Sequence, residues 1–186
     1  MAIDDLIQDA TRRMNKSVEA AQAEFGTLRT GRASTALLDR IQIDYYGQTT
    51  PLKQLATVNS PEPRMLTVQP FDPNSVSAIE RAILESDLGL TPANDGKLIR
   101  LPIPQLTEER RKELVKIVRQ MAEDGRVAVR NVRRDVMHHL KELVDKGEVG
   151  SDEERRAEER VQKLTDENTH TIDELLKKKE AEILEV

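Results

Sequence analysis

Apolar residues recur at intervals of three and four in three long stretches, near residues 2–28, 107–146 and 151–184. This spacing is that of one face of an α-helix, so the pattern predicts three long amphipathic helices. Each apolar stripe is too narrow to be buried by its own helix, and a three-helix bundle is the economical solution. The inward positions of the second helix are Val118, Met121, Gly125, Val129, Val132, Val136, Leu140 and Leu143. Those of the third are Ala157, Val161, Leu164, Asn168, Ile172, Leu175, Leu176 and Ile183.

Capping signals accompany the second and third helices. Thr107 is a residue type that favours the N-cap, and Glu108 and Glu109 follow it in the first turn, where the helix dipole favours acids. Ser151 and Glu154 have the spacing of a capping box, which predicts the start of the third helix.

Proline and charge divide the chain at nearly the same places. All eight prolines lie between Pro51 and Pro104, and a long helix cannot carry proline in its interior. The segment 31–105 is also about half as rich in charged residues as the rest of the chain. We therefore expect a discontinuous helical domain, residues 1–30 and 106–186, that carries an inserted domain, residues 31–105. Two linkers, near 29–33 and 102–106, join them.

The inserted segment has a different periodicity. Ile41, Ile43 and Tyr45 alternate with polar residues and Tyr46, which predicts a strand that ends at a turn. A second strand is expected at 65–68, a helix capped by Asn74 and ending near Gly89, and a last short strand at 98–101. These elements predict a small α/β or mostly-β domain, and the whole chain an α+β fold.

Composition excludes several classes of protein. The chain has no cysteine, which rules out disulfides, thiolate metal sites and a cysteine nucleophile. Acids at the N-terminus and the lack of an apolar run near 20 residues lead us to expect a soluble, cytoplasmic protein that does not enter membranes. The net charge of −5 argues mildly against nucleic-acid binding.

A basic row on the second long helix qualifies that conclusion. Lys112, Lys116, Arg119, Arg126, Arg130 and Arg133 fall on one helical face, with Arg110, Arg111 and Arg134 nearby. Such a row is either a solvated outer face or a set of phosphate contacts, for which the planar guanidinium fork is suited. The residues alone leave both interpretations open.

Other chemistry has little support in the sequence. His138 and His139 are adjacent, so on a helix they point about 100° apart and cannot hold one metal ion together. There is no glycine-rich phosphate loop with the required strand and helix around it, and no ordered Ser-His-Asp set. We therefore expect no catalytic residue, metal or cofactor.

Five segments carry a family resemblance. They are Arg29–Ser34 (RTGRAS), Ile43–Gly47 (IDYYG), Ser86–Leu90 (SDLGL), Pro104–Arg111 (PQLTEERR) and Val129–Arg134 (VRNVRR). In these segments, in length and in the inserted-domain layout, the chain resembles the bacterial ribosome recycling factor family. The resemblance implies an L-shaped α+β protein, with a long three-helix bundle and a small inserted β/α/β domain, whose outline resembles transfer RNA.

The resemblance also implies a function without catalysis. Members of that family bind the large ribosomal subunit after termination and, with elongation factor G and the GTP it hydrolyses, split the ribosome and release messenger and transfer RNA. We expect a monomer. Ribosomal-RNA contacts map onto the second long helix, above all at Arg130, Arg133 and Arg134. The full candidate set is Arg110, Arg111, Arg119, Arg126, Arg130, Arg133 and Arg134.

The two linkers are the second candidate site. Gly31 permits large dihedral changes, whereas Pro102 and Pro104 stiffen the returning chain. A rigid junction and a restricted hinge are both compatible with this. We favour the hinge, because two crossings forbid free tumbling but permit rotation about a common axis. The candidate hinge residues are Arg29, Thr30, Gly31, Arg32, Pro102 and Pro104.

Two other functions were weighed. A helical adaptor or chaperone-like protein-binding module would need the bundle but no RNA contact, and binding to large subunits as a function of salt distinguishes it. A hydrolase with carboxylates in the small domain lacks a convergent acid–base pair.

Overall fold

The computed structural model describes residues 2–185 and contains two compact units. One unit comprises residues 2–29 and 108–185, and the other comprises residues 30–107. Long helices make up the first and a small sheet with a helix the second, so the predicted α+β class is confirmed.

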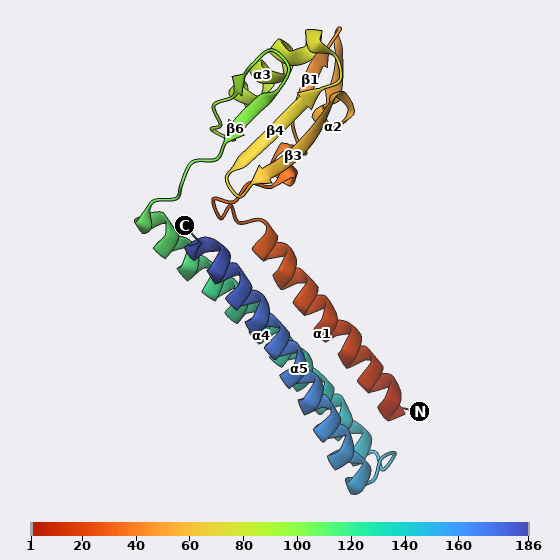
Figure 1. Ribbon diagram of the computed structural model, residues 1–186. Helices are drawn as coiled ribbons and strands as arrows, with labels where there is room; N and C mark the ends of the chain where they lie inside the picture. The colour runs from red at the N-terminus through yellow and green to blue at the C-terminus, as the bar shows by residue number, and fades with distance from the viewer. Residues whose placement is uncertain (1, 186) are drawn as a thin grey trace. The chain divides into compact units, whose positions relative to one another are not determined.

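The first unit is a bundle of three helices that lie side by side, α1 (Ala2–Gly26), α4 (Glu108–Asp145) and α5 (Ser151–Leu184) (Figure 1). Its core is one continuous apolar seam to which all three helices contribute. The buried seam residues are Ile7, Ala10, Met14, Ala21, Phe25, Leu114, Val118, Ala122, Val129, Val132, Val136, Leu140, Ala157, Val161, Ile172 and Ile183.

The three helices approach closely at Gly125 of α4. A Cβ atom there would lie 3.1 Å from the Cβ of Ala21 on α1 and 3.2 Å from Cδ1 of Ile172 on α5. Glycine is costly in a helix interior, by about 1 kcal/mol relative to alanine. Close approach of the three helices explains why this position nevertheless has no side chain.

An ion pair crosses each of the three helix–helix interfaces. Arg13 of α1 contacts Asp135 of α4 at 2.5 Å, Arg126 of α4 contacts Asp173 of α5 at 2.6 Å, and Arg160 of α5 contacts Asp4 of α1 at 3.1 Å. Exposed pairs of this kind contribute about 0–1 kcal/mol each. Burial of the seam therefore provides most of the stability.

The turn between α4 and α5 differs from its sequence prediction. Ser151 is the first residue of α5 and not its N-cap, so the capping box predicted for Ser151 and Glu154 is wrong. Gly150 is the N-cap, and its backbone N–H donates to the Glu153 carboxylate at 3.3 Å. Gly147 ends α4 in the left-handed region, at φ 73°, where glycine carries no steric cost.

The second unit contains a hairpin and a four-stranded antiparallel sheet. The hairpin consists of β1 (Gln42–Tyr45) and β2 (Gln48–Pro51). The sheet has the order β3-β4-β6-β5. Its strands are β3 (Ala56–Glu62), β4 (Met65–Pro70), β5 (Ala93–Asn94) and β6 (Ile99–Pro102). The short elements are η1 (Thr35–Leu38), α2 (Leu52–Leu55) and η2 (Pro73–Ser75).

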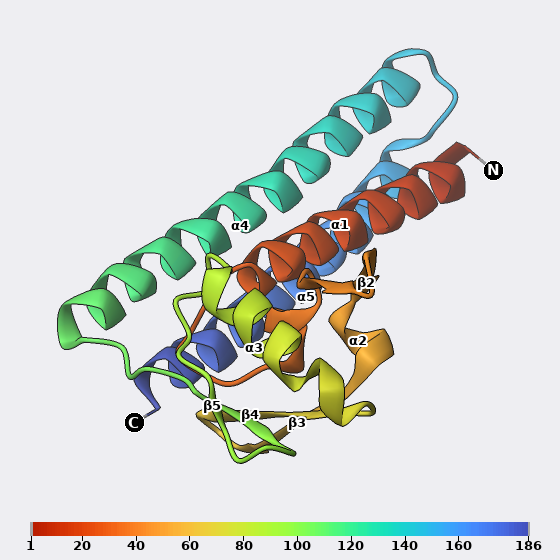
Figure 2. The ribbon, with the colours of Figure 1, turned by 90° about the horizontal axis from the view of Figure 1, so that it is seen from above.

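Helix α3 (Val76–Glu85) lies across one face of this sheet (Figure 2). Its Ile79 and Ile83 are fully buried against the sheet, in one cluster with residues of β1, β4 and β6. The other fully buried strand residues of that cluster are Ile43, Leu66, Val68, Ile99 and Leu101. The predicted cap at Asn74 is wrong, because Asp72 accepts the Asn74 N–H at 2.9 Å and caps η2, which precedes α3.

Of the adjacent tyrosines, one is half-buried and the other is exposed. The Tyr45 hydroxyl donates to Asp72 at 2.8 Å, whereas Tyr46 is 80% exposed. Hydrogen bonds from the backbone N–H of Asn74 and from the Tyr45 hydroxyl hold the pKa of Asp72 below its ordinary value.

We expect Val132→Asp to destabilise the bundle by about 3 kcal/mol or more, since it buries a carboxylate in the seam without a partner. The neighbouring change Asn131→Asp is its control, because Asn131 is exposed on the same helix and the charge change is the same. It should alter the free energy of unfolding by no more than about 0.5 kcal/mol. Urea unfolding of both variants measures the difference, and equal loss of stability would show that the inward face is wrongly assigned.

Candidate nucleic-acid interface

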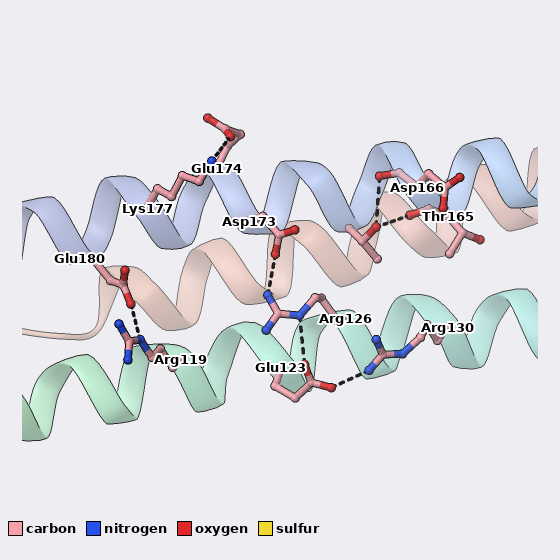
Figure 3. Close-up of polar contacts among 11 residues, drawn as sticks. Arg119, Glu123, Arg126, Arg130, Thr165, Asp166, Asp173, Glu174, Lys177 and Glu180 are labelled. Carbon is pink, nitrogen blue, oxygen red and sulfur yellow. Dashed lines mark hydrogen bonds and ion pairs between the residues drawn. The ribbon is translucent and has the colours of Figure 1, made fainter.

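All seven candidate arginines lie on α4, but their surroundings differ. We call Arg119, Arg126, Arg130, Arg133 and Arg134 the arginine row. Spacings of seven, four and three residues place its first four members along one side of the helix. Figure 3 shows three of them, Arg119, Arg126 and Arg130, together with the carboxylates that they contact.

Arg126 is held between two helices. Its Nε donates to Glu123 at 3.0 Å and its Nη1 donates to Asp173 of α5 at 2.6 Å (Figure 3). The side chain is only 22% exposed. Burial alone would lower the pKa of Arg126, but its hydrogen bonds with the two carboxylates outweigh burial and raise it. Arg126 therefore joins α4 to α5 and has little of its guanidinium available to a ligand.

Arg119 and Arg130 are also paired with carboxylates. Arg119 donates through Nε to Glu180 of α5 at 2.6 Å, and Arg130 donates through Nη2 to Glu123 at 2.5 Å. Donation by Arg126, and to a smaller extent by Arg130, lowers the pKa of Glu123 below its ordinary value. The positive charge of this half of the row is balanced by acids of the same unit.

Arg133 and Arg134 lie in a different environment. Arg133 donates to the neutral amide oxygen of Gln162 at 3.2 Å. Arg134 is exposed, and within residues 2–185 it has no hydrogen-bond or ion-pair partner. The guanidinium groups of these two consecutive residues thus have no carboxylate partner among the described residues, and no carboxylate has to be displaced before a phosphate can bind to either.

Arg110 and Arg111 lie in the first turn of α4, away from the row. Arg110 contacts Glu113 at 2.9 Å. The Nε of Arg111 is buried without a hydrogen-bond partner in the described structure. Neither side chain shares the free charge of Arg133 and Arg134.

The predicted hinge segments contact each other and one turn of the sheet. The Ala33 N–H donates to the Pro63 carbonyl at 2.7 Å, and the Ile103 N–H donates to the Arg64 carbonyl at 2.8 Å. Both segments are therefore fastened to the turn between β3 and β4. Pro102 is the last residue of β6, paired with Met65.

Gly31 is the tightest point between these segments. It has φ 75°, in the left-handed region, and a Cβ there would lie 3.0 Å from Cγ of Leu106. Any other residue would meet both backbone strain and the Leu106 side chain.

Other chemistry finds no support in the part of the chain that the structure describes. Residues 2–185 contain no group of three or more His, Cys, Asp or Glu side chains that could hold a metal ion. His138 and His139 each pair with an acid four residues away, Glu142 and Asp135. None of the described helices has the length and apolar character needed to cross a bilayer.

Comparison with known proteins identifies the family. The family model for ribosome recycling factor matches residues 21–184. Ribosome-recycling factor of Rubrobacter xylanophilus is 58% identical over 180 residues, 97% of each chain. That of Carboxydothermus hydrogenoformans is 51% identical over 184 residues, 99% of this chain and 100% of its own.

Two solved structures also match over nearly the full length. The solution structure of a ribosome recycling factor has a TM-score of 0.75 at 44% identity and covers 100% of this chain and 99% of its own. A second structure represents the T. thermophilus ribosome recycling factor and E. coli elongation factor G bound to the E. coli post-termination complex. It has a TM-score of 0.64 at 49% identity and covers 99% of this chain and 100% of its own.

Sequence and structure thus agree over almost the entire length, and the chain belongs to the ribosome recycling factor family, whose members are translation factors and not enzymes.

Proposed function

We propose that this protein recycles ribosomes after termination: it binds the large subunit through ribosomal RNA and, with elongation factor G, separates the subunits and frees messenger and transfer RNA. Its partner hydrolyses the GTP that drives the separation. Family membership supports the proposal, as does the related factor whose structure was described together with elongation factor G on a post-termination complex.

The free charge at Arg133 and Arg134 is the observation that carries the RNA contact. An exposed guanidinium group without a carboxylate partner can form a bidentate contact with phosphate and release counterions. Arg126 serves a different purpose in this proposal, because its donors already join α4 and α5. Arg119 and Arg130 must exchange a carboxylate for a phosphate to contribute.

Replacement of Arg133 and Arg134 by alanine should weaken binding to purified large subunits. Each lost charge-assisted contact costs about 1–3 kcal/mol, which is about 5-fold to 150-fold in the dissociation constant. The dependence of affinity on salt should become shallower, since fewer counterions are released. Fluorescence binding titrations at several salt concentrations measure both quantities.

Arg155 and Arg156 provide the matched control. They are likewise adjacent and exposed, but they lie on α5. Their double alanine variant has the same net charge as the Arg133, Arg134 variant and should bind with nearly unchanged affinity. An equal loss in both variants, or none in either, would remove this end of α4 from the interface and favour the adaptor alternative.

We further propose that the small unit is turned by the partner during splitting. The contacts of Gly31 with Leu106 and of both segments with the β3–β4 turn make residues 30–107 one body up to its boundary. A force on this unit would then be transmitted through two short segments and not absorbed by flexible loops.

A reversible disulfide tests the proposed rotation. In a Gly31→Cys, Leu106→Cys variant, the sulfur of residue 106 replaces Cγ, which lies 3.0 Å from the Cβ position of residue 31, a separation suited to a disulfide. No native cysteine interferes. Oxidation joins two segments inside residues 30–107, which the proposal treats as one body. It should therefore leave intact both binding to large subunits and splitting with elongation factor G and GTP.

The oxidised and reduced forms of this variant carry the same side chain at residue 31 and hence the same backbone strain. A difference between the two forms therefore reports the disulfide alone. Loss of splitting on oxidation would show that the two segments must move against each other, which would contradict the proposal that residues 30–107 turn as one body.

A further inference from the structure

Glu123 occupies a central position in the arginine row. One carboxylate oxygen accepts from Nε of Arg126 at 3.0 Å, and the other accepts from Nη2 of Arg130 at 2.5 Å (Figure 3). It is thus the acid on α4 that contacts two members of the row. Asp173 and Glu180, which contact the row from α5, hold one arginine each.

Packing does not explain the contact between Glu123 and Arg130. Both residues lie on α4, seven positions apart, so their ion pair joins no two helices. The side chains are 45% and 36% exposed, a setting in which an ion pair adds about 0–1 kcal/mol of stability. The Arg126–Asp173 pair, by contrast, crosses from α4 to α5 and would persist without Glu123.

Glu123 reduces the number of N–H donors that Arg130 can offer to a ligand. A carboxylate and a phosphate compete for the same guanidinium N–H groups, because both are anions whose oxygens accept charge-assisted hydrogen bonds. Glu123 is the partner of Arg130 and fills part of its fork. Arg133 and Arg134 carry no such internal anion.

We propose that Glu123 is a specificity-determining residue. It occupies hydrogen-bond donors of Arg130 and so weakens the contact of Arg130 with RNA of any sequence or shape, an effect that we call the mask. Binding then depends on Arg133 and Arg134, which have no carboxylate partner. This proposal rests on the RNA-binding function proposed above. An RNA that is not the ribosomal binding site can bind in many orientations and place a phosphate at any free guanidinium group. Each free guanidinium group therefore adds to non-specific affinity. On the ribosome the phosphates are fixed, so the fit to Arg133 and Arg134 decides whether the factor binds.

The substitution Glu123→Gln tests the mask, with Asp124→Asn as its control. Both remove one negative charge from neighbouring positions of α4, but Asp124 accepts from Gln120 at 2.9 Å and contacts no arginine. The probe is a mixed-sequence RNA duplex of about 20 base pairs. Relative to Asp124→Asn, Glu123→Gln should bind it about 3-fold to 10-fold more tightly, with a salt dependence steeper by about one unit.

Large subunits are the second probe. The gain in affinity for them should be smaller than the gain for the duplex, so that the ratio of specific to non-specific affinity falls. Equal gains for both would contradict a role in specificity. Equal duplex binding by Glu123→Gln and Asp124→Asn, or weaker binding by Glu123→Gln, would overturn the mask, and weaker binding would mean that Glu123 orients Arg130 for RNA.

A double-mutant cycle shows whether the effect acts through Arg130. Arg130→Gln alone should change duplex affinity little, since this donor is already occupied, but it should abolish the gain that Glu123→Gln produces. A gain that survives in the double variant would contradict the proposal. Thermal unfolding of each variant verifies that the bundle remains intact.

Failure of this proposal and failure of the proposed function give different results. The duplex measurements do not involve ribosomes, so the mask can be refuted while Arg133 and Arg134 remain essential for large-subunit binding. If instead the Arg133, Arg134 double variant binds large subunits normally, the proposed interface fails whatever the duplex shows.

Discussion

Burial of one narrow apolar stripe from each of three long helices is the constraint on which the rest of the bundle depends. The three helices can share a seam only if they approach closely along their whole length, and at Gly125 even a Cβ atom would require Ala21 and Ile172 to shift. This approach fixes the register of α4 against α5. Register in turn brings Asp173 to Arg126 and Glu180 to Arg119, which are 47 and 61 residues apart in sequence.

The charge pattern of the surface follows from that register. Segment 106–144 has a net charge of +3 and segment 145–186 a net charge of −6, and the fold lays part of the second against the first. Carboxylates of α5 thus reach Arg119 and Arg126, while Arg133 meets only the neutral Gln162 of that helix. The RNA contact proposed at Arg133 and Arg134 is therefore compatible with a net charge of −5 for the whole chain.

Periodicity made the bundle predictable, because a stripe repeated over 25 to 38 residues averages out individual exceptions. Ala122 and Thr165 are buried although the pattern did not select them, and Leu164 is only half-buried. Small and polar residues fit a close seam that a count of large apolar residues overlooks. The small unit was harder to predict. β2 and β3 are rich in polar residues and proline, so their strand character depends on pairing with neighbours and not on local preference.

The candidate RNA-binding site was likewise predictable only in part. The row itself could be found from sequence, since its spacing depends on one helix alone. Which arginines are free could not be found, because the partners come from another helix whose register only packing determines. Even Glu123, on the same helix, was hidden among other acids at similar spacings, such as Glu113 beside Arg110.

The most direct test of the account is a sedimentation assay of post-termination ribosome complexes with this protein, elongation factor G and GTP. The account predicts that subunits separate only when all three are present, and that a GTP analogue that cannot be hydrolysed does not support separation. Separation without elongation factor G, or intact ribosomes in the complete mixture, would contradict it.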